Sequence, residues 1–320
     1  MNDMHPARQQ NPSLTCVVPV YNEGDGIVDF LTQLAAALRG ITDQARILVI
    51  DDGSTDNTAR EVVNMSPGLP VGLISLSRNF GKENAIAAGL DHANADIVIV
   101  MDADFQHPLS ILPEFVAKWR LGYDMVYGVR HNRALDIRVY RILSGMFYKV
   151  MSYGASVKIP RDAGDFRLMD RCVVMALRDL PERSKFMKGL YNWVGFTKVA
   201  VTFDVDERKC GKSKFRFFQL YELAMTGITS FSSFPLRIWA GIGAVISGLS
   251  LLYSVWIITD TLLYGANVAG WPTLVVAIFF LGGIQLLSIG ILGEYIARIF
   301  NEVKGRPSYI IARKQGLNEE

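Results

Sequence analysis

The chain has 320 residues, of which 33 are basic and 31 acidic, so its formal net charge is +2. This near balance argues against a nucleic-acid-binding protein that relies on bulk electrostatics, and a hydrophobic content of 50% excludes a disordered chain. The charged residues are unevenly spread, because Asp260 is the only one between Ile238 and Gly293. The composition therefore predicts a soluble domain joined to a membrane segment.

The chain begins with a polar N-terminal tail, residues 1–12, which has no hydrophobic stretch behind basic residues. We therefore expect no signal peptide. The three cysteines, Cys16, Cys172 and Cys210, are too few and too far apart for a disulfide framework or a zinc site. An odd number of thiols without a CxxC motif indicates a reducing compartment, so we expect the soluble part to lie in the cytoplasm.

Residues 13–210 alternate β-rich runs with helical patterns. Runs such as Ile47–Ile50 and Ile97–Val100 are apolar throughout, which is typical of parallel strands covered on both faces. The pattern predicts an α/β fold with a mostly parallel sheet of nucleotide-binding type, whose ligands lie beyond the carboxyl ends of the strands. The predicted strands are Leu14–Val20, Arg46–Ile50, Val71–Leu76, Ile97–Met101 and Met125–Tyr127, and the predicted helices are Gly26–Arg39, Asp56–Asn64, Lys82–His92 and Leu109–Leu121.

Acidic and polar residues collect at three of these strand ends. The first strand leads into Tyr21–Glu23, the second into Asp51–Asp56 and the fourth into Asp102–Pro108. One acidic residue after a strand is often only a helix cap, and Ser54 and Asp56 fit that role, but three clusters are harder to explain in this way. No GxGxxG or GxxxxGK(S/T) motif occurs, so neither a dinucleotide-binding fold nor a P-loop is supported.

Asp102 and Asp104 form a DxD motif. Alternate residues leaving a strand can aim two carboxylates at one hard cation, while substrate phosphates fill its remaining positions. A DxD alone is common by chance, but this one follows a hydrophobic strand in a chain that also carries DDGSTD at 51–56. The motif predicts a Mg²⁺ or Mn²⁺ site.

Two apolar runs of 21 residues, Ile238–Ile258 and Thr273–Gly293, are each long enough to cross the ~30 Å hydrocarbon core of a bilayer. We expect two transmembrane helices within residues 236–297, and a pair of buried core helices is the less favoured alternative. The connector Thr259–Pro272 has no Lys or Arg, whereas basic residues flank both outer ends. The positive-inside rule then places both termini in the cytoplasm, with residues 298–320 as a basic cytoplasmic tail.

Two further stretches are basic and amphipathic, which is typical of helices at a membrane surface. One has an apolar face between Val139 and Val150, which packing against the soluble core explains equally well. The other, Phe215–Met225, lies in a juxtamembrane segment, residues 211–235. The first apolar run has small residues every four positions, a stripe that lets another helix approach, so we expect a homo-oligomer. These residues are Ala240, Ala244 and Gly248.

Further motifs lie along the chain at Ser77–Glu83, Gly164–Met169, Phe186–Gly189, Glu207–Lys214, Gly227–Ser232, Phe234–Trp239, Leu281–Gln285 and Gly293–Ile296. Together with the strand-end motifs they resemble glycosyltransferase family 2. Within it the likeness is to the polyprenyl-phosphate glycosyltransferases, most closely to those that glucosylate bactoprenol. The resemblance extends from Ser13 to Ile311.

The resemblance implies a GT-A catalytic domain at residues 13–210 and a role for individual residues. Asp102, Asp104 and Asp165 would be catalytic, and Asp102, Asp104 and Gln106 would hold the metal. Asp165 would orient the acceptor or act as a base, although a cap or an ion pair with Arg167 fits it equally. The implied substrate-binding residues are Pro19, Tyr21, Glu23, Val49, Asp51, Asp102, Ala103, Asp104, Gln106, Arg130, Arg208 and Lys214. Arg208 and Lys214 also fit as solvated charges that attract anionic lipid.

The implied reaction is an inverting, metal-dependent transfer of a hexose, glucose from UDP-glucose, to polyprenyl phosphate at the cytoplasmic leaflet of a bacterial inner membrane. The implied partners are UDP-glucose, undecaprenyl phosphate, the bilayer, further copies of the chain in a tetramer, and a flippase serving O-antigen or lipopolysaccharide modification. GDP-mannose and UDP-formamido-arabinose are alternative donors. A processive polysaccharide synthase is less favoured, because no QxxRW motif occurs and two spans cannot enclose a polymer channel.

Overall fold

The computed structural model describes residues 8–65, 69–130, 163–182, 185–203 and 270–316, with scattered positions between 245 and 264. Several features predicted from the sequence lie outside these residues and stay predictions. They are the amphipathic stretch at 139–150, the juxtamembrane segment 211–235, Arg208, Lys214, and most of the first apolar run with its small-residue stripe.

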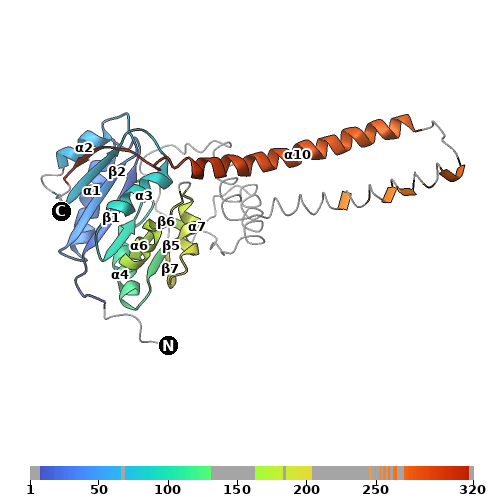
Figure 1. The fold of residues 1–320 in the computed structure, drawn as a ribbon. Helices are drawn as coiled ribbons and strands as arrows, with labels where there is room; N and C mark the ends of the chain where they lie inside the picture. The colour runs from blue at the N-terminus through green and yellow to red at the C-terminus, as the bar shows by residue number, and fades with distance from the viewer. Residues whose placement is uncertain are drawn as a thin grey trace.

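The described strands form one sheet of eight, in the order β7-β5-β6-β4-β1-β2-β3-β8 (Figure 1). Four of the seven neighbouring pairs are parallel, which confirms the predicted α/β fold with a mostly parallel sheet. The central strands β1, β2 and β4 are the apolar runs of the sequence and are almost wholly buried. The strands are β1 Leu14–Val20, β2 Ala45–Asp51, β3 Val71–Leu76, β4 Ile97–Val100, β5 Met125–Arg130, β6 Ala163–Asp170, β7 Lys198–Phe203 and β8 Ile311–Gln315.

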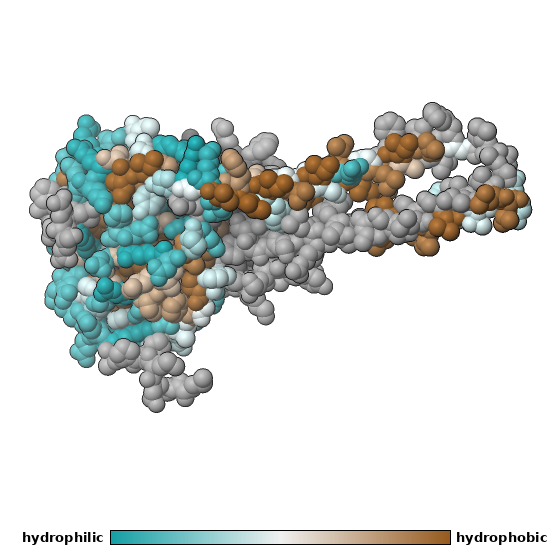
Figure 2. Space-filling view, in the orientation of Figure 1, coloured by the Kyte–Doolittle hydropathy of each residue, from teal (hydrophilic) through white to brown (hydrophobic). Residues whose placement is uncertain are grey.

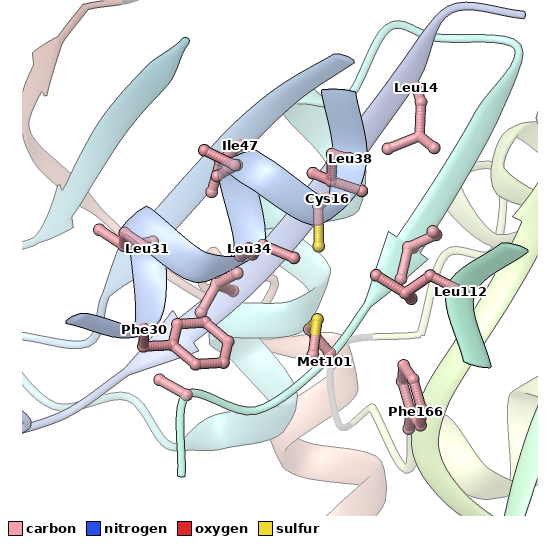
Figure 3. Packing of buried hydrophobic residues seen from close by; sticks show 14 of the residues in the cluster. Leu14, Cys16, Phe30, Leu31, Leu34, Leu38, Ile47, Met101, Leu112 and Phe166 are labelled. Carbon is pink, nitrogen blue, oxygen red and sulfur yellow. The ribbon is translucent and has the colours of Figure 1, made fainter. Parts of the chain in front are cut away.

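Helices cover both faces of this sheet. One face packs against α1, α2 and α4, and Figure 3 shows Phe30 of α1 in this core, together with Cys16 and Ile47 from the strands. The other face packs against α3, α6 and α7. There α3 approaches β1 closely at Gly89, where a Cβ would come within 2.2 Å of Val17 Cγ1. The helices are α1 Ile27–Arg39, α2 Thr58–Met65, α3 Lys82–His92, α4 Leu112–Arg120 after the 3₁₀ turn η1 Leu109–Ile111, α6 Arg171–Arg178, α7 Met187–Trp193 and α10 Trp271–Val303.

Part of the segment expected to be a C-terminal tail belongs to the sheet. β8 pairs antiparallel with β3 and forms its outer edge. The Ser77 N–H donates to the Ile310 carbonyl at 2.8 Å, and the Tyr309 hydroxyl donates to Asp91 Oδ2 at 2.8 Å. A charged strand is tolerated at this place because the side chains of an edge strand can face water. The chain that follows α10 is therefore tied to the same sheet as the strand-end motifs.

The helix α10 extends away from the sheet as a long arm (Figure 1). Its 33 residues correspond to about 50 Å at ~1.5 Å per residue. The stretch Phe280–Val303 has a mean hydropathy of 1.5 and no buried residues, so by length and composition this helix can cross a membrane. The apolar surface of α10 stands out from the mostly polar surface of the sheet domain (Figure 2). The second predicted span, Thr273–Gly293, lies within α10, whereas the described residues contain one such helix and not two.

Candidate active site

The direction of the strands brings the predicted site residues to one edge of the sheet. The parallel strands β1, β2, β4 and β5 all end at this edge, whereas the antiparallel strand β6 begins there. Val100 of β4 pairs with Arg167 of β6, which is the last pair of this ladder, and Asp102 and Asp165 each lie two residues beyond it. The fold therefore places the DxD motif beside a carboxylate from a distant part of the sequence.

A lysine joins these two carboxylates. The ammonium nitrogen of Lys82 lies 2.7 Å from Asp102 Oδ1 and 2.8 Å from Asp102 Oδ2. The same nitrogen lies 3.1 Å from Asp165 Oδ2. The Asp165 side chain is 9% exposed, whereas that of Lys82 is 45% exposed. Asp165 is thus paired with Lys82, a partner that differs from the Arg167 considered from sequence.

The charges in this trio stabilise one another. Desolvation alone would lower the pKa of Lys82, but the carboxylates of Asp102 and Asp165 outweigh it and hold this pKa above its usual value. Burial alone would raise the pKa of Asp165, but Lys82, then Lys188 and Arg167, outweigh it and hold this pKa below its usual value. Asp165 is accordingly an ionised carboxylate and a poor proton donor at neutral pH.

The rest of the DxD loop is held by hydrogen bonds of Gln106. The Gln106 N–H donates to Asp104 Oδ1 at 3.1 Å, and Arg130 donates to Gln106 Oε1 at 3.1 Å. Between them Phe105 has a φ of 59°, a left-handed conformation that is unusual for a bulky residue. Its ring lies against Phe30 at 5.3 Å between centroids, a core contact that offsets the strain. Asp104, Gln106 and Arg130 thus lie side by side, and their roles toward a substrate or metal stay predictions.

The loops after β1 and β2 are joined by hydrogen bonds. The Asn22 N–H donates to Ser54 Oγ at 2.9 Å, and the Thr55 N–H donates to Asn22 Oδ1 at 2.8 Å. Ser54 thus fastens the first loop and does not cap α2, whereas Asp56 accepts from the Thr58 N–H at 2.9 Å, where α2 begins. Tyr21 is 40% exposed beside this pair of loops.

Other members of the predicted base-binding set lie deeper. Val49 is fully buried in the core, and Asp51 is 3% exposed and accepts from the Ser54 N–H at 2.9 Å. In this structure Val49 is a core residue, and Asp51 fixes the turn that follows β2. Their contact with a nucleotide, like that of Pro19, Tyr21, Glu23 and Ala103, stays a prediction.

The neighbouring Asp52 fixes the start of α3. Its two oxygens accept from the Phe80 N–H at 2.7 Å and the Gly81 N–H at 2.9 Å. Burial raises the pKa of Asp52 more than these donors lower it. Gly53 fits under the same loop, since a Cβ there would come within 2.4 Å of the Arg78 carbonyl carbon. The end of β2 therefore sets the position of Lys82, the first residue of α3.

A layer of buried charge lies behind this trio. Glu83 Oε2 accepts from the Met187 N–H at 2.8 Å, and burial followed by the charge of Asp165 raises the pKa of Glu83 to about 7. The guanidinium carbon of Arg167 lies 3.4 Å from the centre of the Tyr191 ring. These groups are close enough to Asp165 to act on it electrostatically, since Arg167 helps to lower its pKa.

Sequence reasoning missed Lys82 as a member of the site. One signal was available, because a lysine at the first position of a helix opposes the helix dipole, which favours acidic residues there. Such a residue needs a compensating partner. The partners are the two carboxylates, which only the fold brings to it.

The DxD loop fits a divalent cation on the chemistry of its donors. Asp102, Asp104 and Gln106 offer hard oxygen ligands, and the Lys82 ammonium already places a positive charge on Asp102. Within the described residues no group of three or more acidic, histidine or cysteine side chains could hold a metal by itself. A Mg²⁺ or Mn²⁺ ion held by these side chains would have further coordination positions for water or substrate phosphate oxygens.

Known proteins resemble this chain over almost all of its length. The glycosyl transferase family 2 profile matches residues 15–178, and the GtrB C-terminal hairpin profile matches residues 234–299. The SfII prophage-derived bactoprenol glucosyl transferase of Shigella flexneri is 45% identical over 306 residues, which cover 95% of this chain and 99% of that protein. An uncharacterized glycosyltransferase of Synechocystis sp. is 43% identical over 305 residues, which cover 95% and 96%.

A solved structure is more remote. The mannosyltransferase of Pyrobaculum calidifontis in complex with GDP-Man and Mn²⁺ is 17% identical, with a TM-score of 0.45, and the match covers 94% of this chain and 90% of that one. The family profile and the close relatives, in contrast, span the strand-end motifs and the helical arm alike. They show that the chain belongs to glycosyltransferase family 2 and is a glycosyltransferase.

Proposed function

We propose that this glycosyltransferase moves glucose from UDP-glucose to polyprenyl phosphate at the cytoplasmic face of a bacterial inner membrane. The observation that carries the proposal is the convergence of Asp102, Asp104, Gln106, Arg130 and Asp165 at one edge of the sheet. The Shigella flexneri relative, named for glucosyl transfer to bactoprenol, supports the glucose and the acceptor. GDP-mannose and UDP-formamido-arabinose remain the alternative donors.

The proposed reaction does not need a strong general base. The acceptor is a phosphate oxygen that is already anionic, and it forms a bond to the anomeric carbon while the bond from that carbon to the nucleoside diphosphate breaks. Attack from the side opposite the leaving group inverts the anomeric centre, and no proton needs to move. Asp165, held ionised by Lys82, would orient the acceptor and not remove a proton.

The leaving diphosphate gains charge in this step. Arg130 is placed next to the DxD loop through Gln106 and would stabilise that charge. Asp102 and Asp104 would hold a Mg²⁺ or Mn²⁺ ion, which supplies charge neutralisation of the diphosphate when bound. Arg208 and Lys214, before the membrane segment, would meet the lipid phosphate.

The position of the helical arm supports a membrane-anchored enzyme with two spans. The chain leaves the sheet at Phe203, whereas α10 begins at its end far from the sheet and returns to it (Figure 1). An outward crossing before Trp271 is therefore part of the proposal, in agreement with the matching hairpin profile. We place both termini in the cytoplasm by the positive-inside rule, and we expect a homo-oligomer such as a tetramer, with a flippase receiving the product.

The test is transfer of labelled glucose by membranes that contain the full-length protein and undecaprenyl phosphate. We expect label from UDP-glucose in the chloroform-extractable fraction, and its loss in Asp102→Ala and Asp104→Ala. Asp29→Ala, in the exposed first turn of α1, is the matched control and should transfer as the native protein does. Label from GDP-mannose or UDP-formamido-arabinose instead would overturn the glucose assignment, and activity in both DxD variants would overturn metal-assisted transfer.

A further inference from the structure

The Lys82 ammonium stands where a divalent cation would have to bind. It contacts both oxygens of Asp102, at 2.7 and 2.8 Å, and reaches Asp165 at 3.1 Å. A divalent ion that shares those oxygens with the ammonium would bind less tightly, because two like charges within about 4 Å repel each other. The lysine and the metal therefore compete for Asp102.

The backbone of Lys82 is fixed, whereas its side chain is partly exposed to solvent. The Gly81 N–H, one residue before it, is held by Asp52 at 2.9 Å, whereas the Lys82 side chain is 45% exposed. Four rotatable methylene groups separate the two ends. The ammonium can leave Asp102 while the start of α3 stays in place.

We propose that Lys82 is an exchangeable counter-ion, which keeps divalent metal off Asp102 until a nucleoside diphosphate arrives and so makes metal binding depend on the donor. This inference rests on the proposed function, because it takes the nucleotide sugar as the ligand. In the empty site Lys82 offsets one of the two negative charges of Asp102 and Asp165. A diphosphate offers the ammonium new anionic partners and also supplies oxygen ligands beyond those that the described residues bring together.

Coupling of this kind is reciprocal. If the nucleotide raises the affinity for the metal, the metal raises the affinity for the nucleotide by the same factor. When no donor is present, Lys82 would keep Asp102 and Asp165 paired. A merely structural ion pair makes a different prediction, since its removal would loosen the site and would not strengthen metal binding.

The experiment measures Mn²⁺ binding to the full-length protein in detergent by the loss of the free Mn²⁺ signal in electron paramagnetic resonance, with and without UDP. We expect UDP to tighten Mn²⁺ binding to the native protein by about tenfold or more. Lys82→Met keeps the side-chain length and removes the charge. It should bind Mn²⁺ about tenfold more tightly than the native protein without UDP, and the effect of UDP should shrink by a similar factor.

Three further variants complete the design. Lys82→Arg keeps the positive charge and should behave like the native protein, and Lys118→Met, on α4 away from the site, is the matched control. Lys82→Gln replaces Lys82→Met if the latter does not give a cooperative thermal transition. The inference is overturned if, without nucleotide, the uncharged variants bind Mn²⁺ no more tightly than the native protein. It is also overturned if neither UDP nor GDP changes the affinity of the native protein for Mn²⁺.

The result also separates this inference from the donor assignment. If GDP and not UDP tightens Mn²⁺ binding, and the Lys82 variants still lose that dependence, the counter-ion role stands while the UDP-glucose proposal fails. If UDP acts as expected but Lys82→Met resembles the native protein, the donor stands and the role of Lys82 fails.

Discussion

Glu83 links the pH dependence of stability to the layer behind the active site. It follows Lys82 in α3 and accepts from the Met187 N–H at 2.8 Å. Burial, and next the charge of Asp165, raise its pKa from 4.5 to about 7, although the Met187 N–H, Lys188 and Lys82 act in the opposite direction. Near neutral pH the fold therefore carries a carboxyl group that resists ionisation.

The sign of the effect follows from proton linkage. An acid with a higher pKa in the folded state binds more protons there, so its contribution is fully present below pH 4.5 and is lost as the pH rises through about 7. The difference between 4.5 and about 7 corresponds to about 3 kcal/mol at most, at ~1.36 kcal/mol per pKa unit. For a domain of about 200 residues that is a Tm change of up to about 6–12 °C.

Glu83→Gln isolates the contribution of Glu83 ionisation to stability. The amide oxygen of glutamine can still accept from the Met187 N–H, and the side chain cannot ionise. We expect thermal unfolding of the full-length protein in detergent to give similar Tm values for both proteins at pH 5. At pH 8.5 the variant should be the more stable by several degrees. Glu114→Gln, on the exposed side of α4, is the control, because it makes the same substitution at a solvent-exposed position and should leave the pH dependence of the Tm unchanged. A Glu83→Gln variant that is less stable at pH 8.5, or that loses stability in parallel with the native protein, would refute the reasoning.

Two further changes probe the packing of α3 and the role of β8. Gly89→Ala should lower the free energy of unfolding by about 1–3 kcal/mol, because its Cβ would meet Val17 Cγ1 at 2.2 Å; Gly164→Ala, whose Cβ has no neighbour closer than 3.9 Å, is the control in a denaturant titration. A chain that ends after Gly305 lacks β8, and its free energy of unfolding should fall by about 1 kcal/mol for each backbone hydrogen bond that is lost, so that it unfolds at a lower temperature. We also expect this truncated chain to lose transfer to long-chain lipid phosphate. A truncated chain with native Tm and turnover would show that β8 is dispensable.

The central part of the fold follows from local sequence. The bounds predicted for β1, β3 and α3 are those of the structure, and a proline or glycine marks the start of two of them, Pro70 before β3 and Gly81 before α3. The helix predicted at Leu109–Leu121 also forms, with its first turn as a 3₁₀ turn. The DxD loop and Arg130 meet at one edge because parallel strands share their carboxyl ends.

The remaining strands depend on partners that local patterns do not reveal. β6 carries a buried arginine, Arg167, whose pKa is lowered by burial and whose guanidinium lies on the Tyr191 ring. β8 reads as a polar tail, since only an edge position makes its charged residues acceptable. Lys82 was overlooked for the same reason, because its two partners come from strands that meet only in the folded sheet.

The antiparallel direction of β8 has a further consequence for the acceptor. β8 begins where β3 ends, since Ile311 pairs with Leu76, and this is the edge of the sheet at which Asp102 lies. Seven residues, 304–310, separate the end of α10 from β8. Even fully extended they span at most about 25 Å at ~3.3–3.6 Å per residue. Helix α10 thus ends within a short reach of the active-site edge. If α10 crosses the membrane as proposed above, the acceptor phosphate at the bilayer surface and the nucleotide sugar meet at the same carboxylates.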